Sequence, residues 1–387
     1  MANIVIIGPV YPLRGGLATY NERLAKAFQE QGDTVEIITF SLQYPSFLFP
    51  GQTQYSTEAP PVNLQIKALI NSVNPLSWVS TGLYLKKSRP DFIIFRFWLP
   101  FMGPAFGTIA RLAAQNNYTR ILALTDNAIP HEKRIGDVPF TKYFLSACQG
   151  FITMSRAVLQ DLEKLQPNKP KVYHPHPLYD NFGEPEPKAE AIKALGLDPA
   201  YQYLLFFGFI RAYKGLDLLL EAFADERLQA LPVKLIIAGE FYEDAQPYEQ
   251  IIKKYNLEHR LVRATEFIPN SQVVHYFCAA DLVVQPYKHA TQSGVSQIAY
   301  HFNKPMLVTD VGGLAELIPD GKAGYVTAAQ PQAIADALLD FYTRNREAKL
   351  VANIPELKKQ FSWESMVSTM KQLAQSLAPH SGNSARS

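Results

Sequence analysis

The chain has 387 residues, of which 47% are hydrophobic and 19% are charged, and its formal net charge is +2. This length suits two domains of ordinary size, and the composition excludes a disordered chain. The near-neutral charge argues against a nucleic-acid partner. The two cysteines, Cys148 and Cys278, lie far apart in apolar surroundings, which favours buried thiols over a disulfide.

The first half of the chain alternates predicted strands and helices. Residues 3–8 are expected to form the first strand, and Gly15 and Gly16 precede a helix that starts near Leu17. This glycine pair either makes a tight turn or lets a ligand approach bare backbone. Residues 64–85 are expected to be helical. The first residues have the pattern of a strand and not of a signal peptide, and the sequence has no run of about 18 apolar residues. These two observations predict a cytoplasmic protein.

The second half repeats this alternation. Six strands are expected near residues 203–207, 233–239, 260–264, 281–285, 305–309 and 323–326, with helices between them. The pattern predicts an α/β protein with two Rossmann-like, doubly wound domains that face each other across a cleft. We expect an N-terminal domain over residues 1–180, a C-terminal domain over 181–355, a helix over 356–377 and a disordered tail over 378–387.

One strand–loop–helix stretch, residues 203–223, combines features of a phosphate site. Gly208 ends the apolar strand, and Arg211 and Lys214 precede the helix. A helix N-terminus and two cations suit a phosphorylated ligand. The alternative is that both cations are solvated loop residues.

A set of motifs in the second half resembles the donor-binding half of glycosyltransferase family 4, whose members are retaining enzymes of GT-B architecture. These motifs are Ala280-Asp281-Leu282 with Pro286, the turn at Ser293-Gly294, residues 303–313, Glu316 and residues 320–325. Residues 203–223 are similar to the family's phosphate-binding segment, 235–240 to the strand beside the nucleotide base, and 14–40 to its opening glycine loop and helix.

The resemblance implies transfer of a sugar from a UDP- or GDP-linked donor to a glycan or lipid-linked acceptor, in cell-surface polysaccharide or glycolipid synthesis. It assigns diphosphate binding and leaving-group stabilisation to Arg211 and Lys214. The expected donor contacts are Gly15, Gly16, Gly208, Gly239, Glu240, Ser293, Gly294, Val295 and Gln297. We expect no cofactor and no metal, because the sequence has neither a DxD pattern nor a His/Cys cluster.

Polar residues after the predicted strand 120–125 are expected to serve the acceptor. By the resemblance, Asp126 orients the acceptor hydroxyl or acts as general base, with helix capping as the alternative. Asn127 and His131 follow as acceptor contacts, although His131 also fits a loop histidine with no role in binding.

The chain departs from the family at a pair of glutamates that members carry eight positions apart. Ala290 and Ile298 occupy those positions here. Because retaining transfer on this fold is thought to use the donor's own phosphate as base, the loss need not abolish chemistry. The alternative function is a catalytically silent, nucleotide-sugar-binding partner subunit. A nicotinamide-dependent enzyme is disfavoured by the absence of GxGxxG after the first strand.

Two features indicate peripheral contact with the inner face of a membrane. Aromatic residues gather in the loop 43–49, and Lys86, Lys87 and Arg89 end a predicted helix. These residues suit either an anionic membrane surface or a lipid-linked acceptor. The alternative is a solvated helix end.

Overall fold

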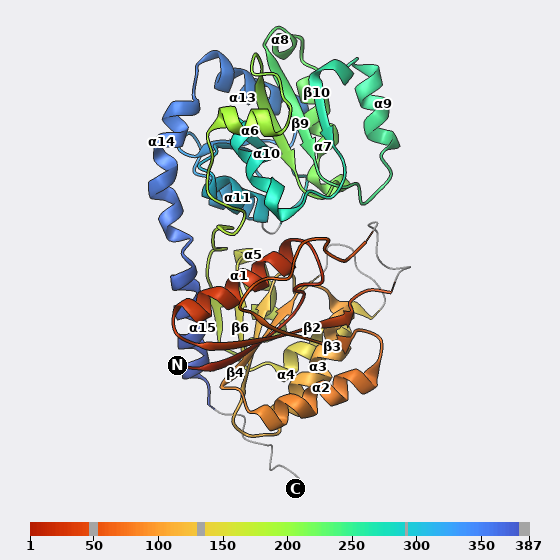
Figure 1. Ribbon diagram of the computed structural model, residues 1–387, viewed down its shortest axis with the longest axis vertical. Helices are drawn as coiled ribbons and strands as arrows, with labels where there is room; N and C mark the ends of the chain where they lie inside the picture. The colour runs from red at the N-terminus through yellow and green to blue at the C-terminus, as the bar shows by residue number, and fades with distance from the viewer. Residues whose placement is uncertain (46–52, 130–135, 291–292, 379–387) are drawn as a thin grey trace. The chain divides into compact units, whose positions relative to one another are not determined.

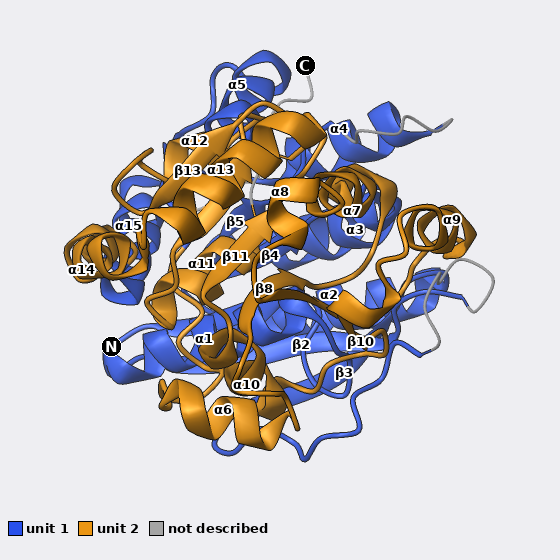
Figure 2. Cartoon of the chain, turned by 90° about the horizontal axis from the view of Figure 1, so that it is seen from above, with its two compact units in different colours: residues 1–176, 362–387 blue, residues 177–361 orange. Residues whose placement is uncertain are grey.

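The computed structural model describes residues 1–45, 53–129, 136–290 and 293–378. The chain divides into two compact units, which Figures 1 and 2 show: residues 1–176 with 362–387, and residues 177–361. Each unit contains a parallel sheet with helices. Two Rossmann-like α/β units confirm the fold class predicted from the sequence, while the cleft between them stays a prediction.

The first unit has a seven-stranded parallel sheet in the order β3-β2-β1-β4-β5-β6-β7. Its strands are β1 (Asn3–Ile7), β2 (Thr34–Leu42), β3 (Gln65–Asn71), β4 (Phe92–Phe97), β5 (Arg120–Thr125), β6 (Gly150–Thr153) and β7 (Lys171–Tyr173). Its helices are α1 (Gly16–Glu30), α2 (Pro75–Ser88), the 3₁₀ turn η2 (Pro100–Met102), α3 (Gly103–Ala114), α4 (Asp137–Ala147), α5 (Arg156–Leu165) and α15 (Trp363–Ser376).

The central strands of this sheet are apolar runs because both of their faces are covered. On one face, Phe95 of β4 packs against Phe106 of α3 and Phe144 of α4, with ring centroids 5.3 and 5.4 Å apart. On the other face, Phe28 of α1 packs against Phe92 at 6.1 Å. Helices α2, α3 and α4 therefore cover one face and α1 covers the other.

The second unit has a six-stranded parallel sheet in the order β10-β9-β8-β11-β12-β13. Its strands are β8 (Gln202–Phe207), β9 (Val233–Ala238), β10 (Leu261–Ala264), β11 (Leu282–Gln285), β12 (Met306–Thr309) and β13 (Gly324–Thr327). Its helices are α6 (Lys188–Ala194), α7 (Leu216–Phe223), α8 (Glu226–Gln229), α9 (Gln246–Lys254), α10 (Val273–Ala279), α11 (Gly294–His301), α12 (Leu314–Leu317), α13 (Pro331–Thr343) and α14 (Glu347–Leu357), with 3₁₀ turns η3 (Ala212–Lys214), η4 (Glu258–Arg260), η5 (Asn270–Gln272) and η6 (Lys358–Gln360).

Strand β8 lies at the centre of this second sheet, between β9 and β11. Its side chains Leu204 and Phe206 join a core with Leu216, Leu220 and Phe223 of α7. The apolar period of α7 thus buries one face of the helix directly beside the strand that precedes it. This packing fixes the short loop between β8 and α7, where the predicted phosphate site lies.

The prediction of a helix over residues 64–85 is wrong at its start. Residues 65–71 form the edge strand β3, which pairs with β2, and α2 begins only at Pro75. The boundary has a local cause: the side chain of Asn74 accepts from the amide of Leu76 at 3.0 Å, and Pro75 fits the first helical position.

The unit boundaries also differ from those expected at 180/181 and 355/356. They fall at 176/177 and 361/362, and α15 belongs to the first unit. Lys371 of α15 pairs with the buried Asp33 at 2.7 Å, and Ser365 lies 3.0 Å from the His174 ring. Of the tail expected to be disordered, residues 379–387 lie outside the described residues.

Candidate functional site

The Nζ atom of Lys214 lies at the carboxyl end of β8, against Gly208. Gly208 has φ +95°, and a β-carbon on it would come within 2.9 Å of Nζ and 3.7 Å of Val295 at the start of α11. Lys214 is buried, with 8% of its surface exposed. Burial, with a smaller contribution from the nearby charge of Arg211, lowers the pKa of Lys214 to about 7. A buried amine with a depressed pKa is suited to binding an anion that restores its charge.

The loop after β11 holds the β8–α7 loop in place. The amide of Lys288 donates to the carbonyl of Tyr213 at 2.7 Å, and the Lys288 ammonium lies 2.6 Å from Asp217. Gly215, with φ +68°, packs so closely on the carbonyl of Pro286 that any β-carbon there would clash. The Lys214 segment is thus fixed from two sides, by its own helix and by the next loop of the sheet.

Arg211 lies on the exposed side of the same loop, over an aromatic ring. Its guanidinium carbon is 5.3 Å from the ring centroid of Tyr242. Tyr242 stacks on Phe209 at 4.2 Å, and Phe209 stacks on Phe267 at 6.4 Å. The Tyr242 ring at one end of this aromatic stack, Tyr242–Phe209–Phe267, makes a cation–π contact with the guanidinium. It leaves Arg211 exposed, with its charge close enough to act on Lys214.

The N-terminus of α11 lies close to Lys214. Ser293 is the N-cap residue, and its hydroxyl lies 3.4 Å from that of the buried Tyr287, whose ring centroid is 5.7 Å from Lys214 Nζ. Gly294 begins the helix against Tyr179, where a β-carbon would meet the ring at 2.7 Å. Amide groups in a first helical turn have no acceptor within the helix. Together with the nearby Lys214 they offer positively charged donors suited to phosphate oxygens.

Gln297 lies one turn further along α11 and is fully buried. Neither its Nε2 nor its Oε1 atom has a hydrogen-bond partner among the described residues. An unpaired buried amide costs roughly 1–3 kcal/mol, so such a group calls for an explanation.

Gly239 and Glu240 directly follow the neighbouring strand β9. Gly239, with φ +139°, packs on the backbone of Gly208, so that only glycine fits there. Glu240 is buried, and its carbonyl accepts from the amide of Ile210 at 2.8 Å. The predicted donor residues of the second unit therefore converge on the carboxyl ends of β8 and β9 and the start of α11.

The first unit holds the other predicted residues at the carboxyl ends of its own strands. Gly15, with φ +103°, is the N-cap residue of α1, and Gly16 begins that helix. Asp126 follows β5 and is buried; Arg96 of β4 donates to both of its oxygens, Nε at 2.6 Å and Nη2 at 2.7 Å. The ring of Tyr20 from α1 covers Arg96 at 4.0 Å. Asn127 is half-buried, and His131 lies outside the described residues.

Sequence reasoning missed the residues that support the predicted ones: Arg96, Tyr20, Tyr287 and Tyr242. Arg96 left a signal, because a charged residue stands inside the otherwise apolar strand FIIFRF. A buried charge requires a partner, and a carboxylate at the end of the neighbouring strand is the natural one. The tyrosines left no signal that distinguishes them from core aromatics.

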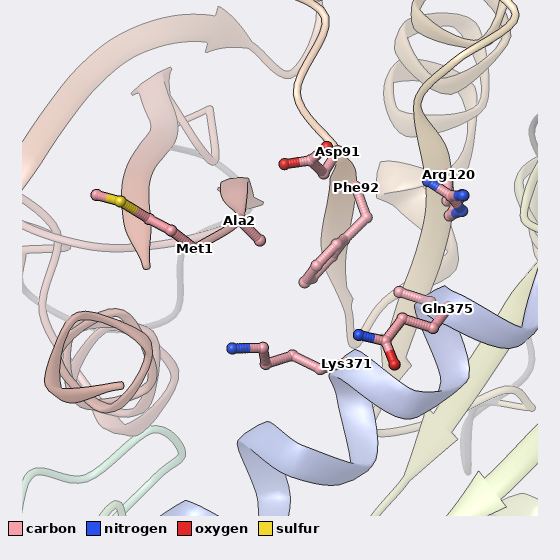
Figure 3. Close-up of a pocket in the computed structure, with 8 residues that line it drawn as sticks. Met1, Ala2, Asp91, Phe92, Arg120, Lys371 and Gln375 are labelled. Atoms are coloured by element: carbon pink, nitrogen blue, oxygen red, sulfur yellow. The ribbon is translucent and has the colours of Figure 1, made fainter. Parts of the chain in front are cut away.

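The first unit contains a pocket of about 260 Å³ that is lined by Met1, Ala2, Asp91, Phe92, Arg120, Lys371, Ala374 and Gln375. Figure 3 shows it in close-up. It lies at the amino ends of β1, β4 and β5, the sheet edge opposite to Asp126. Its polar groups make contacts that hold segments of the first unit together. Asp91 accepts from the amide of Asn3 at 2.7 Å, and Lys371 pairs with Asp33. We therefore assign this pocket no part in the candidate site.

Among residues 1–45, 53–129, 136–290 and 293–378, no three histidine, cysteine or acidic side chains are grouped so that they could hold a metal ion. Within the same ranges, no helix combines the length and apolarity that crossing a membrane requires.

Comparison with known proteins gives a family match in the second unit. Residues 201–344 match the family model of the glycosyl transferases group 1. A D-inositol 3-phosphate glycosyltransferase of Corynebacterium urealyticum is 28% identical over 194 residues, which are 48% of this chain and 46% of the relative. A lipopolysaccharide core biosynthesis mannosyltransferase of Rhizobium meliloti is 31% identical over 193 residues, covering 47% and 54%. The chain thus spans about half the length of these curated relatives.

Solved structures match nearly the whole chain in fold. Sucrose-phosphate synthase from Thermosynechococcus elongatus aligns with a TM-score of 0.74 at 18% identity, covering 96% of this chain and 98% of its own. HepE of Anabaena, in complex with UDP and glucose, aligns with a TM-score of 0.73 at 16% identity, covering 97% and 100%. These likenesses establish the GT-B class of fold.

Proposed function

Because residues 201–344 match the family model of the glycosyl transferases group 1, we propose that the chain is a retaining glycosyltransferase. It moves a sugar from a UDP- or GDP-linked donor to a glycan or lipid-linked acceptor in cell-surface polysaccharide or glycolipid synthesis. The observation that carries the proposal is the buried Lys214 ammonium at the end of β8, beside the start of α11. The UDP and glucose bound by HepE and the mannosyltransferase relative support a nucleotide-sugar donor.

The chemistry assigned to this site is stabilisation of a leaving diphosphate. As the bond to the sugar breaks, negative charge builds on the diphosphate oxygens. Lys214, Arg211 and the first amides of α11 are the donors that meet this charge without reorganising. Removing one such donor typically costs about 10²–10³ in turnover.

The test compares Lys214→Met with Lys214→Arg. Lys214→Met removes the charge but fills the same buried space, so we expect transfer or donor hydrolysis to fall at least a hundredfold. The melting temperature should hold or rise, because the cost of burying an amine disappears. Binding of UDP-glucose and GDP-mannose, measured as a thermal shift, identifies the base. Undiminished turnover in Lys214→Met contradicts the proposal.

A second function is favoured by one specific feature, the missing glutamate pair. By the resemblance drawn from the sequence, Ala290 and the buried Ile298 occupy the positions of the family's glutamate pair. The corresponding role is a catalytically silent subunit that binds a nucleotide sugar for a partner. Donor binding that is abolished by Lys214→Met, with no transfer to any acceptor in a broad glycan panel, favours this function over the first.

The roles of the first unit's residues belong to the same proposal. Gly15 and Gly16 bring bare backbone to the donor, and Asp126 with Asn127 and His131 serves the acceptor. Both oxygens of Asp126 are held by Arg96, and a carboxylate held in this way is a poor base. We therefore favour the orienting role for Asp126 over the general-base role.

A further inference from the structure

The β8–α7 loop is hydrogen-bonded to the loop that follows β9. The amide of Ile210 donates to the carbonyl of Glu240 at 2.8 Å, and the carbonyl of Ile210 accepts from the amide of Tyr242 at 3.0 Å. This is the bonding pattern of a parallel ladder. One step further, the amide of Ala212 donates to the Oε2 atom of Glu243 at 2.7 Å. A side-chain carboxylate therefore continues the pairing of the two backbones past the ends of both strands.

The hydrogen bond from Ala212 lies at the start of the segment that carries Lys214. Ala212 begins the 3₁₀ turn η3, and Lys214 is the last residue of this turn. An amide at the start of a helix has no acceptor within the helix, and a side-chain oxygen that accepts from it stabilises that end. The contact with Glu243 therefore holds the backbone from which the Lys214 ammonium extends toward Gly208.

A buried tyrosine holds the Glu243 carboxylate from the other side. The hydroxyl of Tyr248, in α9, donates to the Oε1 atom, which is the oxygen that does not accept from Ala212. Burial first, and then the hydrogen bond to Glu243, raises the pKa of the Tyr248 hydroxyl, so it keeps its proton and remains a donor. The Tyr248 ring packs on that of Phe241, with centroids 5.7 Å apart. Each carboxylate oxygen thus has a fixed partner, one in the loop and one in the core.

We propose that Glu243 is a positioning residue for the β8–α7 loop and acts on the donor through Lys214. The inference rests on the proposed function, because it takes Lys214 to bind a diphosphate. A carboxylate repels a diphosphate, so the charge of Glu243 gives it no direct role in holding the donor. Its role lies in its two oxygens, which tie a backbone amide of the loop to a hydroxyl of α9.

The test compares two substitutions of Glu243, with dissociation constants for UDP and for GDP measured by calorimetry on the full chain. Glu243→Gln keeps an oxygen that accepts from the amide of Ala212, and its NH₂ group can donate to the oxygen of Tyr248. Glu243→Ala removes both contacts. We expect Glu243→Ala to raise the dissociation constant of the nucleotide that binds about tenfold, because Lys214 is no longer held in place. Glu243→Gln should restore it to within about twofold of wild type, since position and not charge is what Glu243 supplies.

Glu249→Ala is the matched control, because it removes the same charge from α9, where Glu249 pairs with Arg263 of β10 at 2.9 Å. We expect it to leave the affinity for the nucleotide unchanged. The double variant of Glu243→Ala with Lys214→Met shows which residue Glu243 acts through. The effects of coupled residues do not add, so Glu243→Ala should weaken binding by less than about twofold once Lys214→Met is present.

Three results overturn the positioning role alone, in a chain whose nucleotide affinity Lys214→Met does reduce. They are equal affinities in Glu243→Ala and Glu249→Ala, a Glu243→Gln variant as weak as Glu243→Ala, and a tenfold loss that persists beside Lys214→Met. The last result assigns Glu243 to the general stability of the second unit. The proposed function fails in a different way. A wild-type chain that binds neither UDP nor GDP, or a Lys214→Met variant that binds as wild type does, overturns both proposals.

Discussion

The ammonium of Lys214 lies against the α-carbon of Gly208, at the distance where a β-carbon would come within 2.9 Å of Nζ. Lys214 therefore occupies the space that any other residue at position 208 fills with its side chain. This relationship ties the glycine that ends β8 to the charge of the loop that follows it. A methyl group added at position 208 therefore tests the position of the ammonium.

Gly208→Ala should displace the Lys214 ammonium and weaken donor binding. The flexible end of the lysine yields more readily than backbone, so Nζ moves and the fold persists. Placing alanine at positive φ costs roughly 1–2 kcal/mol by itself. Gly321→Ala is the matched control, because Gly321 has φ +69° and open space around it. We expect similar losses of stability in urea unfolding but a donor affinity lowered about tenfold in Gly208→Ala alone. Equal donor affinities in the two variants contradict the assignment.

The depressed pKa of Lys214 predicts that donor binding depends on pH. Burial first, then the charge of Arg211, lowers this pKa from 10.5 to about 7. Below pH 7 the amine is already charged, so a diphosphate binds without proton uptake. Above pH 7 the protein must take up a proton on binding, and affinity falls by up to tenfold per pH unit. Calorimetry in two buffers of different ionisation enthalpy should count this proton, and Lys214→Arg should show none.

The lowered pKa of Lys214 also predicts how the free energy of unfolding changes with pH. The unfolded chain keeps the lysine proton up to its ordinary pKa of 10.5, whereas the folded protein releases it near pH 7. The folded state binds fewer protons in this window, so the contribution of Lys214 to stability rises between pH 7 and pH 10.5. Lys214→Met should lack this rise.

Tyr242 should position Arg211 for the donor. The guanidinium lies over the Tyr242 ring, and contacts of this kind contribute about 0.5–1 kcal/mol at exposed sites. Tyr242→Leu should therefore raise the KM for the donor a few-fold while kcat changes little, and Tyr242→Phe should restore it. Tyr255→Leu is the control, because Lys254 makes the same kind of contact outside the candidate site. The Nζ atom of Lys254 lies 4.6 Å from the centroid of the Tyr255 ring. A Tyr242→Phe variant as weak as Tyr242→Leu points to the hydroxyl instead of the ring.

Much of the fold follows from local patterns that sequence reasoning can detect. Apolar runs such as 203–207 mark strands covered on both faces, and the period of α7 marks the helix after it. The glycine and the two cations of that stretch indicated a phosphate site from residue types alone. The structure adds what local patterns do not contain, such as the packing of Gly208 on Lys214.

The parts that sequence reasoning missed depend on contacts between distant segments. Strand β3 alternates weakly and is exposed at the sheet edge, so its apolar residues also fit a helical pattern. Helix α15 joins the first unit through Lys371 and Asp33, which are 338 positions apart. No window of sequence contains both partners. The pairing of Arg96 with Asp126 is of the same kind.

Substitutions of Asp126 can separate a structural role of its carboxylate from a chemical one. Both of its oxygens are held by the buried Arg96, and removing one partner of a buried ion pair typically costs about 3–5 kcal/mol. We expect Asp126→Asn to lower the free energy of unfolding in urea by roughly this amount, since it leaves the guanidinium uncompensated. Asp126→Leu combined with Arg96→Met should recover much of the loss, because neither charge then remains buried. Donor binding by the second unit should persist in the double variant, whereas acceptor use should fall if Asp126 orients the acceptor. If instead Asp126→Asn abolishes transfer while urea stability and the affinity for the donor stay at wild-type values, the carboxylate acts as a base and the ion pair is incidental.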